Sequence, residues 1–276
     1  MRFVVVLLLF SSIGYAQDAV QVTWSADLAY FVQEGMRDAE DNTYLSLTGC
    51  EGLCSSAALI KIDSNYELLW GVQLGNTENP RIYFIDFDEN QNVIFAGEYQ
   101  VEVETEEGII TEPIKFVGKI NQNGDVLWIN EFQVGPLYGL SSLSVGGNGD
   151  IIITIDLALF ETPAQIIGFN QVGDLLFERS IGGDFFVNLR GTISLGNNLF
   201  FSHGQIPLGG ELNPFVGVHS STEFLWATRY YHATDHLSPT NIIKMAENKL
   251  IATGSTTDFW GEGNITEGYV IEFDTL

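Results

Sequence analysis

The hydrophobic positions of the chain fall in short runs separated by polar turns, and this pattern recurs at a nearly constant distance. The recurring order is strand, polar turn, strand with an aromatic residue, as in "LIKIDSNYELLWGVQLG" (59–75), "FVGKINQNGDVLWINEFQVG" (116–135), "IIGFNQVGDLLFERSIGG" (166–183) and "FVGVHSSTEFLWATRYY" (215–231). The aromatic residues are Trp70, Trp128, Phe177 and Trp226, which are 58, 49 and 49 residues apart, and Trp24 comes 46 residues before the first. A period near fifty indicates a propeller or a solenoid.

A second pair of strands fits between successive aromatic residues. It occurs in "RIYFIDFDENQNVIFAGEYQ" (81–100), "LSSLSVGGNGDIIITIDLAL" (140–159), "LRGTISLGNNLFFSHGQI" (189–206) and "TNIIKMAENKLIATGSTT" (240–257). Each period therefore holds four strands rich in Val, Ile, Phe and Tyr, and no segment has a sustained helical period. Runs such as "NVIFAG" and "DIIITI" are continuously apolar, which favours sheets covered on both faces, as in a propeller, over a sandwich with one wet face.

The two ends of the chain predict how such a propeller closes. The last segment, "GYVIEFDTL", matches the third strand of a repeat, and "VQVTWSADL" near the N-terminus matches the fourth strand that is missing there. The sequence thus predicts an all-β, five-bladed propeller with four antiparallel strands per blade, closed by the N-terminal strand. Residues 17–276 would form this single domain.

The first sixteen residues have the order of a secretory signal peptide. They carry Arg2, an apolar run from Phe3 to Phe10, and small residues with Gly14 and Ala16 at the positions that a signal peptidase prefers. The alternative, a membrane anchor, would need about 20 apolar residues. We therefore expect cleavage before Gln17 and a secreted, periplasmic or cell-surface protein, without a lipid anchor because no cysteine stands at the cleavage point.

The charge of the chain limits its partners. Once Arg2 is removed, 10 Lys and Arg remain against 36 Asp and Glu, a formal net charge of −26. Such a charge repels phosphate backbones and anionic lipid, so nucleic acid and membrane insertion are not expected. Basic protein patches or calcium fit better, although the acid can also serve solubility alone.

The chain has two cysteines, Cys50 and Cys54, in "TGCEGLCSSA". In an oxidising compartment these residues can form a disulfide that staples one loop. A metal site is the alternative, but two cysteines without a nearby third or fourth ligand make an incomplete one.

The repeat with its turn glycine and Asp-x-Leu-Trp ending resembles the propeller repeats of exported bacterial proteins, both the quinoprotein-like and the SBBP-type repeats. The resemblance implies that Trp24, Trp70, Trp128 and Trp226 dock neighbouring blades, with Phe177 as a departure. The quinoprotein enzymes have more blades, and this chain shows no counterpart of their adjacent-cysteine motif or of their cofactor-binding residues. Their redox activity is therefore not expected here, nor is any cofactor.

The densest group of residues suited to binding lies in two loops, "YHATDHLSPT" (231–240) and "STTDFWGEGNITEG" (255–268), which the strand order places on the same face. They offer an aromatic platform with polar groups, of the kind that sugars and peptides use: Tyr231, His232, Asp235, His236, Asp258, Phe259 and Trp260. The alternative is that the loop aromatics only cover the rim of the domain. A metal pair at His232 and His236 would need a helix, which Pro239 disfavours.

Two acidic stretches have both a plain and a functional interpretation. In "DFDENQN" (86–92), Asp86, Asp88 and Asn90 begin a calcium-loop pattern, but the later ligands are missing and we expect a solvated turn. In "EVETEEG" (102–108), alternate glutamates are expected on one face of a projecting hairpin. They would discourage edge pairing, or contact calcium or a cationic partner.

The sequence offers little for catalysis. It has no G-x-S-x-G, H-E-x-x-H or phosphate-loop motif, so no catalytic or metal-ligating residue is predicted. We expect a non-catalytic binding module at a bacterial cell surface, with protein or carbohydrate as its partner. The alternative is a carbohydrate-active enzyme of the five-bladed glycosidase type, whose paired carboxylates a sequence cannot locate.

Overall fold

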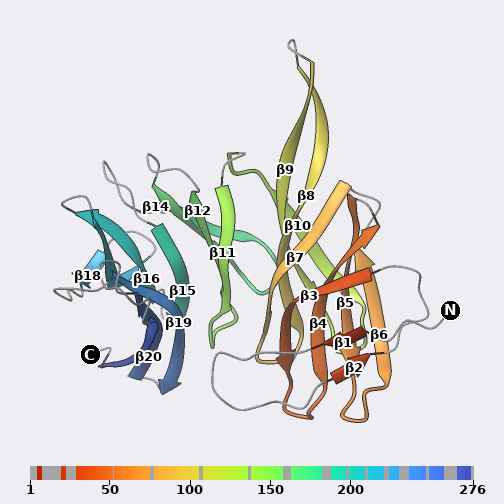
Figure 1. Cartoon of the computed structure of the whole chain (residues 1–276), viewed down its shortest axis with the longest axis horizontal. Coiled ribbons are helices and arrows are strands. Elements are labelled where there is room, and N and C mark those ends of the chain that lie inside the picture. Colours follow the sequence, from red (N-terminus) through yellow and green to blue (C-terminus); the bar gives the residue numbers. More distant parts are fainter. Residues whose placement is uncertain are drawn as a thin grey trace. The chain divides into compact units, whose positions relative to one another are not determined.

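The computed structural model is built from β-strands joined by turns (Figure 1). It describes residues 5–7, 20–22, 29–51, 53–74, 78–105, 108–135, 138–157, 163–181, 188–196, 199–208, 211–220, 224–229, 236–246, 249–257 and 266–274. Among these residues there is no helix with the length and apolar character needed to cross a membrane.

The strands are β1 (Val5–Leu7), β2 (Val20–Val22), β3 (Ala29–Arg37), β4 (Thr43–Glu51), β5 (Leu53–Ile62), β6 (Leu68–Leu74), β7 (Glu78–Phe87), β8 (Val93–Thr105), β9 (Gly108–Ile120), β10 (Val126–Phe132), β11 (Tyr138–Val145), β12 (Ile151–Leu157), β13 (Ala164–Phe169), β14 (Leu175–Ile181), β15 (Asn188–Gly196), β16 (Leu199–Leu208), β17 (Glu211–Ser220), β18 (Phe224–Arg229), β19 (His236–Ala246), β20 (Lys249–Thr257) and β21 (Thr266–Asp274).

The strands pair in sequence order into one sheet per repeat. Four sheets have four strands each, β3–β6, β7–β10, β11–β14 and β15–β18, and β19–β21 form a three-stranded sheet. We call these the first to the fifth sheet. The prediction of an all-β chain with four antiparallel strands per repeat is confirmed for the first four sheets, and this organisation is consistent with a propeller-like fold.

The chain divides into two compact units. Unit 1 consists of Met1–Ile85 and Gly97–Pro113, and unit 2 of Asp86–Ala96 and Ile114–Leu276. The first sheet lies in unit 1 and the third to fifth sheets lie in unit 2, whereas the second sheet contributes to both. That residues 17–276 form a single domain stays a prediction.

The predicted N-terminal closure is not seen among the described residues. There, β2 pairs with β1 from Val5↔Val22 to Leu7↔Val20, and the fifth sheet ends at β21. Trp24 lies outside the described residues. The five-bladed, closed propeller therefore remains a prediction.

Among the described residues, six hairpins turn through the same five-residue loop, at 38–42, 63–67, 88–92, 121–125, 146–150 and 170–174. In each, the first N–H donates to the fifth carbonyl and the fourth N–H donates to the first carbonyl. The fourth residue has a positive φ; it is Asp41, Tyr66, Gln91, Gly124, Gly149 or Gly173. This is the turn with a G1-type bulge that a right-handed twisted hairpin favours.

An Asp or Asn side chain holds five of these six loops at their first position. In the loop at 121–125, Asn121 Oδ1 accepts hydrogen bonds from the backbone N–H groups of Asn123 and Asp125, both at 2.9 Å. Asp38, Asp63, Asp88 and Asn170 make the same two bonds in their loops. These bonds explain why three of the loops tolerate a non-glycine residue at positive φ, where glycine is usual.

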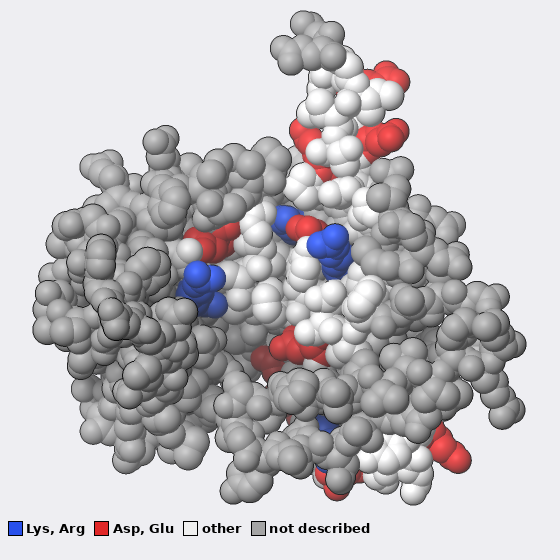
Figure 2. Space-filling view, viewed as in Figure 1, with Lys and Arg blue, Asp and Glu red and all other residues white. Residues whose placement is uncertain are grey.

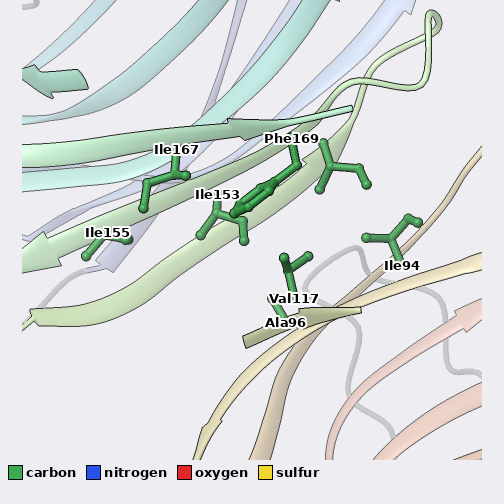
Figure 3. Packing of buried hydrophobic residues seen from close by; sticks show 8 residues of the cluster. Ile94, Ala96, Val117, Ile153, Ile155, Ile167 and Phe169 are labelled. Carbon is green, nitrogen blue, oxygen red and sulfur yellow. The ribbon is translucent and has the colours of Figure 1, made fainter. Parts of the chain in front are cut away.

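In the first four sheets, the core lies mostly on the middle strands. The continuously apolar runs are buried on both faces, as predicted: Ile151, Ile152, Ile153 and Ile155 of β12 are at most 1% exposed. In unit 2, Ile94, Ala96 and Val117 of the second sheet join five residues of β12 and β13 in one hydrophobic cluster (Figure 3). Of the residues from β12 and β13, Figure 3 labels Ile153, Ile155, Ile167 and Phe169.

The fourth strands of the first three sheets bury one face only. Strands β6 and β10 have the same alternation of exposed and half-buried residues, and β14 differs from it only at its last position. Trp70, Trp128 and Phe177 are half-buried on them rather than fully buried as core residues. Phe177 packs against Phe200 of the fourth sheet with ring centroids 5.2 Å apart, so the residue that departs from tryptophan also contacts the next sheet.

Candidate functional site

The backbone of the fifth sheet brings the ends of the two predicted ligand loops together. His236 starts β19 and pairs with Thr257, the last residue of β20, and Thr257 also pairs with Thr266, the first residue of β21. The loops at 231–235 and 258–265 therefore leave the same end of this sheet. Of the seven predicted site residues, only His236 is described; the others lie outside the described residues: Tyr231, His232, Asp235, Asp258, Phe259 and Trp260.

The loop end of the fifth sheet is polar along its strands. Ser238 pairs with Ser255, and Thr256 pairs with Glu267. Further from the loops, the sheet pairs aliphatic residues, such as Ile243 with Ile251. His236 begins a strand, so the helical spacing that a metal pair with His232 would need is absent at this residue.

The fourth sheet contains a serine–histidine pair that no sequence motif predicted. Ser202 Oγ lies 2.8 Å from His219 Nε2, and His219 Nδ1 lies 2.9 Å from the carbonyl oxygen of Ser220. Because a carbonyl can only accept, Nδ1 carries the proton, and Nε2 of the neutral ring accepts from the Ser202 hydroxyl. Thr192 Oγ1, 2.7 Å from Ser202 Oγ, extends the chain of hydrogen bonds.

This pair resembles a nucleophile with its base, but it is closed to substrate. Ser202 and His219 are each 0% exposed. Burial, together with the charge of Arg179, lowers the pKa of His219 to about 4, although the Ser220 hydrogen bond opposes this shift. The pair therefore serves as a buried polar link between β16 and β17 rather than as a catalytic site.

His203 is a second buried histidine of the fourth sheet. Its ring packs over Gly191, where a Cβ would come within 2.5 Å of Nε2. Burial, and then the charge of Arg190, lower its pKa to about 4, so the ring is neutral at physiological pH. The sequence did not single out either buried histidine, because nothing in a strand pattern shows which cross-strand neighbour a histidine meets.

The acidic turn at 86–92 is solvated at Glu89 and Asn90, as expected, but Asp88, the first residue of its five-residue loop, is buried. Asp88 is 4% exposed, and its Oδ2 lies 2.7 Å from Lys119 Nζ and accepts from Asn92 Nδ2 at 2.8 Å. Burial raises the pKa of Asp88, but the hydrogen bonds from Lys119 and Asn92 and the lysine charge outweigh this effect and leave the pKa below its usual value. Asp88 is thus committed to an internal ion pair rather than to calcium.

The first sheet repeats this ion pair. Lys61 Nζ lies 3.5 Å from Asp38 Oδ2, and both side chains are buried. The described residues contain no group of three or more His, Cys, Asp or Glu side chains that could hold a metal ion.

Carboxylates on the first strands of two sheets bind backbone groups of the following sheet. Glu34 Oε2 of β3 accepts from the N–H of Ile85 on β7 at 2.5 Å, within unit 1. Asp86 Oδ2 of β7 accepts from the N–H of Val145 on β11 at 2.8 Å, within unit 2. Burial raises the pKa of Asp86, although its hydrogen bonds from Phe87 and Val145 oppose this. Both carboxylates hold strands together.

The fourth strand of one sheet docks on a turn of the next within unit 2. Trp128 Nε1 donates to the carbonyl oxygen of Gln171 at 3.2 Å, which confirms the docking role that the repeat implied for this tryptophan. Two residues further along, Asn130 Nδ2 donates to the Gly173 carbonyl. Arg179, two residues after Phe177, donates to the Ser220 carbonyl at 2.5 Å in the same way.

The backbone register sets Cys50 directly opposite Cys54 across β4 and β5. Directly opposed residues in antiparallel strands have Cα atoms about 4.5 to 5.5 Å apart, within the range that a disulfide spans. The disulfide stays a prediction, and this register is compatible with it.

Comparison with known proteins shows only the fold. No family model and no curated protein sequence matches the chain. Similar solved structures include hydrazine synthase of Kuenenia stuttgartiensis (TM-score 0.59, 12% identity, covering 91% of this chain and 64% of that one). A puromycin hydrolase S511A mutant complexed with PGG (TM-score 0.54, 11% identity, 93% and 38%) and the polysaccharide lyase Uly1 (TM-score 0.50, 12% identity, 96% and 60%) are also similar.

These similarities extend along nearly the whole chain but at very low identity. The chain spans less than two thirds of the length of each of these three proteins. They have β-rich folds consistent with a propeller-like fold. The chain shares this β architecture with them. Their activities are not assigned to this chain.

Proposed function

We propose that the chain is a secreted, non-catalytic binding module built on a five-bladed β-propeller. In this proposal residues 17–28 supply the fourth strand of the fifth sheet. Support comes from the strand count, since each of the first four sheets has four strands and the fifth has three among the described residues. The segment "VQVTWSADL" has the sequence of a fourth strand, including its tryptophan.

The ligand face is formed by the loops at 231–235 and 258–265. The observation that carries this assignment is the register His236↔Thr257↔Thr266, which makes both loops leave one end of one sheet. Tyr231, Phe259 and Trp260 supply apolar contact area, and neighbouring His and Asp residues supply hydrogen-bonding groups. This combination suits a carbohydrate or a peptide at a bacterial cell surface.

The polar groups that could suggest catalysis have structural partners instead. The Ser202–His219 pair is fully buried, and Asp88 is paired with Lys119. Asp86 binds a backbone N–H of the neighbouring strand. These commitments favour a binding module over the carbohydrate-active enzyme.

The experiment is the double substitution Tyr231→Ala and Trp260→Ala, tested on a glycan array and a peptide array. If the aromatics form the ligand platform, binding is lost while the melting temperature stays nearly unchanged, because exposed aromatics carry contact energy without supporting the core. The matched control is Tyr66→Ala, an exposed tyrosine in the turn between β5 and β6 that should leave binding intact.

Two results would contradict the proposal. A lower melting temperature with no change in array binding would show that these aromatics only pack on the rim. Cleavage of a bound glycan, abolished by Asp235→Asn or Asp258→Asn, would replace the binding module with the carbohydrate-active enzyme.

A further inference from the structure

One hairpin extends beyond the rest of its sheet. Strands β8 and β9 have 13 residues each, and the other hairpins between second and third strands have strands of at most 10. Strand β10 pairs with β9 only from Ile120 to Lys115. We call residues 101–105 and 108–113 the arm; it is the long projecting end of the β8–β9 hairpin in Figure 1.

The arm has an open edge along β9. No described strand pairs with Gly108–Ile114 on the side where β10 would continue. Pro113 lacks an N–H group and so limits pairing near the body of the sheet, which leaves Gly108–Glu112 as the free segment. Thr105 Oγ1 donates to the Gly108 carbonyl at 2.8 Å and ties the two strands at their far end.

Aliphatic side chains are exposed on this free segment. Ile109 is 64% and Ile110 is 43% exposed. The other strongly exposed aliphatic residues mostly recur at equivalent positions of the fourth strands, as Leu68 and Leu69, Val126 and Leu127, and Leu175 and Leu176 do. Ile109 and Ile110 belong to no such repeat, so the common scaffold does not account for them.

The arm carries charge of one sign. Between residues 97 and 113 the sequence has six glutamates and no Lys or Arg: Glu98, Glu102, Glu104, Glu106, Glu107 and Glu112. Glu102 and Glu104 are exposed and alternate with half-buried valines, as predicted for a projecting hairpin, and acidic side chains line the arm in Figure 2.

The negative charge of the arm disfavours binding of acidic partners at this edge and favours binding of a basic one. Like charges prevent pairing with a second copy of the chain, which is the usual reason for charging an edge strand. The same field repels nucleic acid and anionic lipid. A strand added beside β9 would lie about 5 Å from β9 and about 10 Å from β8, within roughly one Debye length of the glutamates at 0.1 M salt.

We propose that the arm is a docking edge for an extended cationic segment of a partner protein, in which Lys or Arg alternates with aliphatic residues. The segment adds to the sheet along Gly108–Glu112. Its main chain pairs with the free edge. Because successive side chains of a strand point to opposite faces, its aliphatic residues cover one of the two isoleucines on one face, and its basic residues lie on the face that carries Glu102 and Glu104.

The test uses a fluorescent octapeptide of alternating lysine and valine. Binding followed by anisotropy should weaken as NaCl rises from about 20 to about 150 mM, whereas the glutamate–valine octapeptide should not bind. Ile109→Thr with Ile110→Thr keeps β-branched side chains but removes apolar contact, and should weaken binding about tenfold. Leu68→Thr with Leu69→Thr is the matched control and should bind as the unchanged protein does.

Two further measurements separate docking from general attraction to an acidic protein. Glu102→Gln with Glu104→Gln should reduce the salt dependence. Hydrogen exchange of the unchanged protein should slow at residues 108–112 when the peptide is bound. The proposal is overturned if the peptide does not bind, if the isoleucine variant binds as tightly as the control, or if these amides gain no protection.

Discussion

At the scale of single residues, the first and second sheets each bury an Asp–Lys ion pair at equivalent positions. Asp88 and Lys119 pair in the second sheet, and Asp38 and Lys61 pair in the first. Each lysine lies opposite the tryptophan on the fourth strand of its sheet, Trp128 for Lys119 and Trp70 for Lys61. In the third sheet glycines stand at both equivalent positions. Gly146 takes the place of the aspartate at the start of the turn, and Gly168, opposite Phe177, takes the place of the lysine. Joint loss is expected, because an unpaired buried charge costs far more than the pair contributes.

We therefore predict that Lys119→Met destabilises the protein strongly, by about 3–5 kcal/mol, since it leaves Asp88 buried without its partner. Adding Asp88→Asn should restore part of the loss. Chemical denaturation of both variants measures this. Equal stabilities of the single and double variants would contradict the coupling.

At the scale of elements, the hairpins are the part that the sequence predicts best. Each needs only a local pattern: two apolar runs and a five-residue loop that begins with Asp, Asn or Gly. The contacts between hairpins could not be predicted in this way. The Asp88–Lys119 pair and the Ser202–His219 pair depend on which side chains the strand register brings together, so the burial of Asp88 was not expected and the buried histidines were missed.

We predict that stability depends on pH through His219, which belongs to the hydrogen-bonded chain across β15, β16 and β17. Because burial lowers the pKa of His219 to about 4 from an unfolded value near 6.5, the unfolded state binds more protons between these values. The stability that the neutral ring contributes is complete above pH 6.5 and is lost as the pH falls toward 4. The limit is about 1.4 kcal/mol per pH unit for one such group.

The measurement is the melting temperature between pH 7 and pH 4 for the unchanged protein and for His219→Gln. The variant removes one titrating ring, so its melting temperature should fall less steeply with acid, although His203 still contributes. An identical slope in both proteins would show that His219 is not neutral in the fold.

At the scale of the whole molecule, the order of the strands could be predicted from the sequence. The described strands do not test whether the ring closes. Successive sheets follow from the repeat of about fifty residues, and within unit 2 they are joined by fourth-strand side chains that bind turns of the next sheet. Closure depends on two segments at opposite ends of the chain. In the structure β2 pairs with β1, which lies inside the predicted signal peptide, so removal of residues 1–16 would leave β2 without this partner.

Closure can be tested with two shortened chains. The chain that begins at Gln17 keeps the closing strand and should be monomeric with a cooperative thermal transition. The chain that begins at Ala29 lacks it and should unfold at a lower temperature or form oligomers, because β21 then presents a row of unpaired N–H and C=O groups to other molecules. Size-exclusion chromatography with light scattering and thermal denaturation distinguish these outcomes. If the shorter chain is monomeric and melts at the same temperature as the longer one, residues 17–28 do not close the fold, and the fifth sheet is complete with three strands.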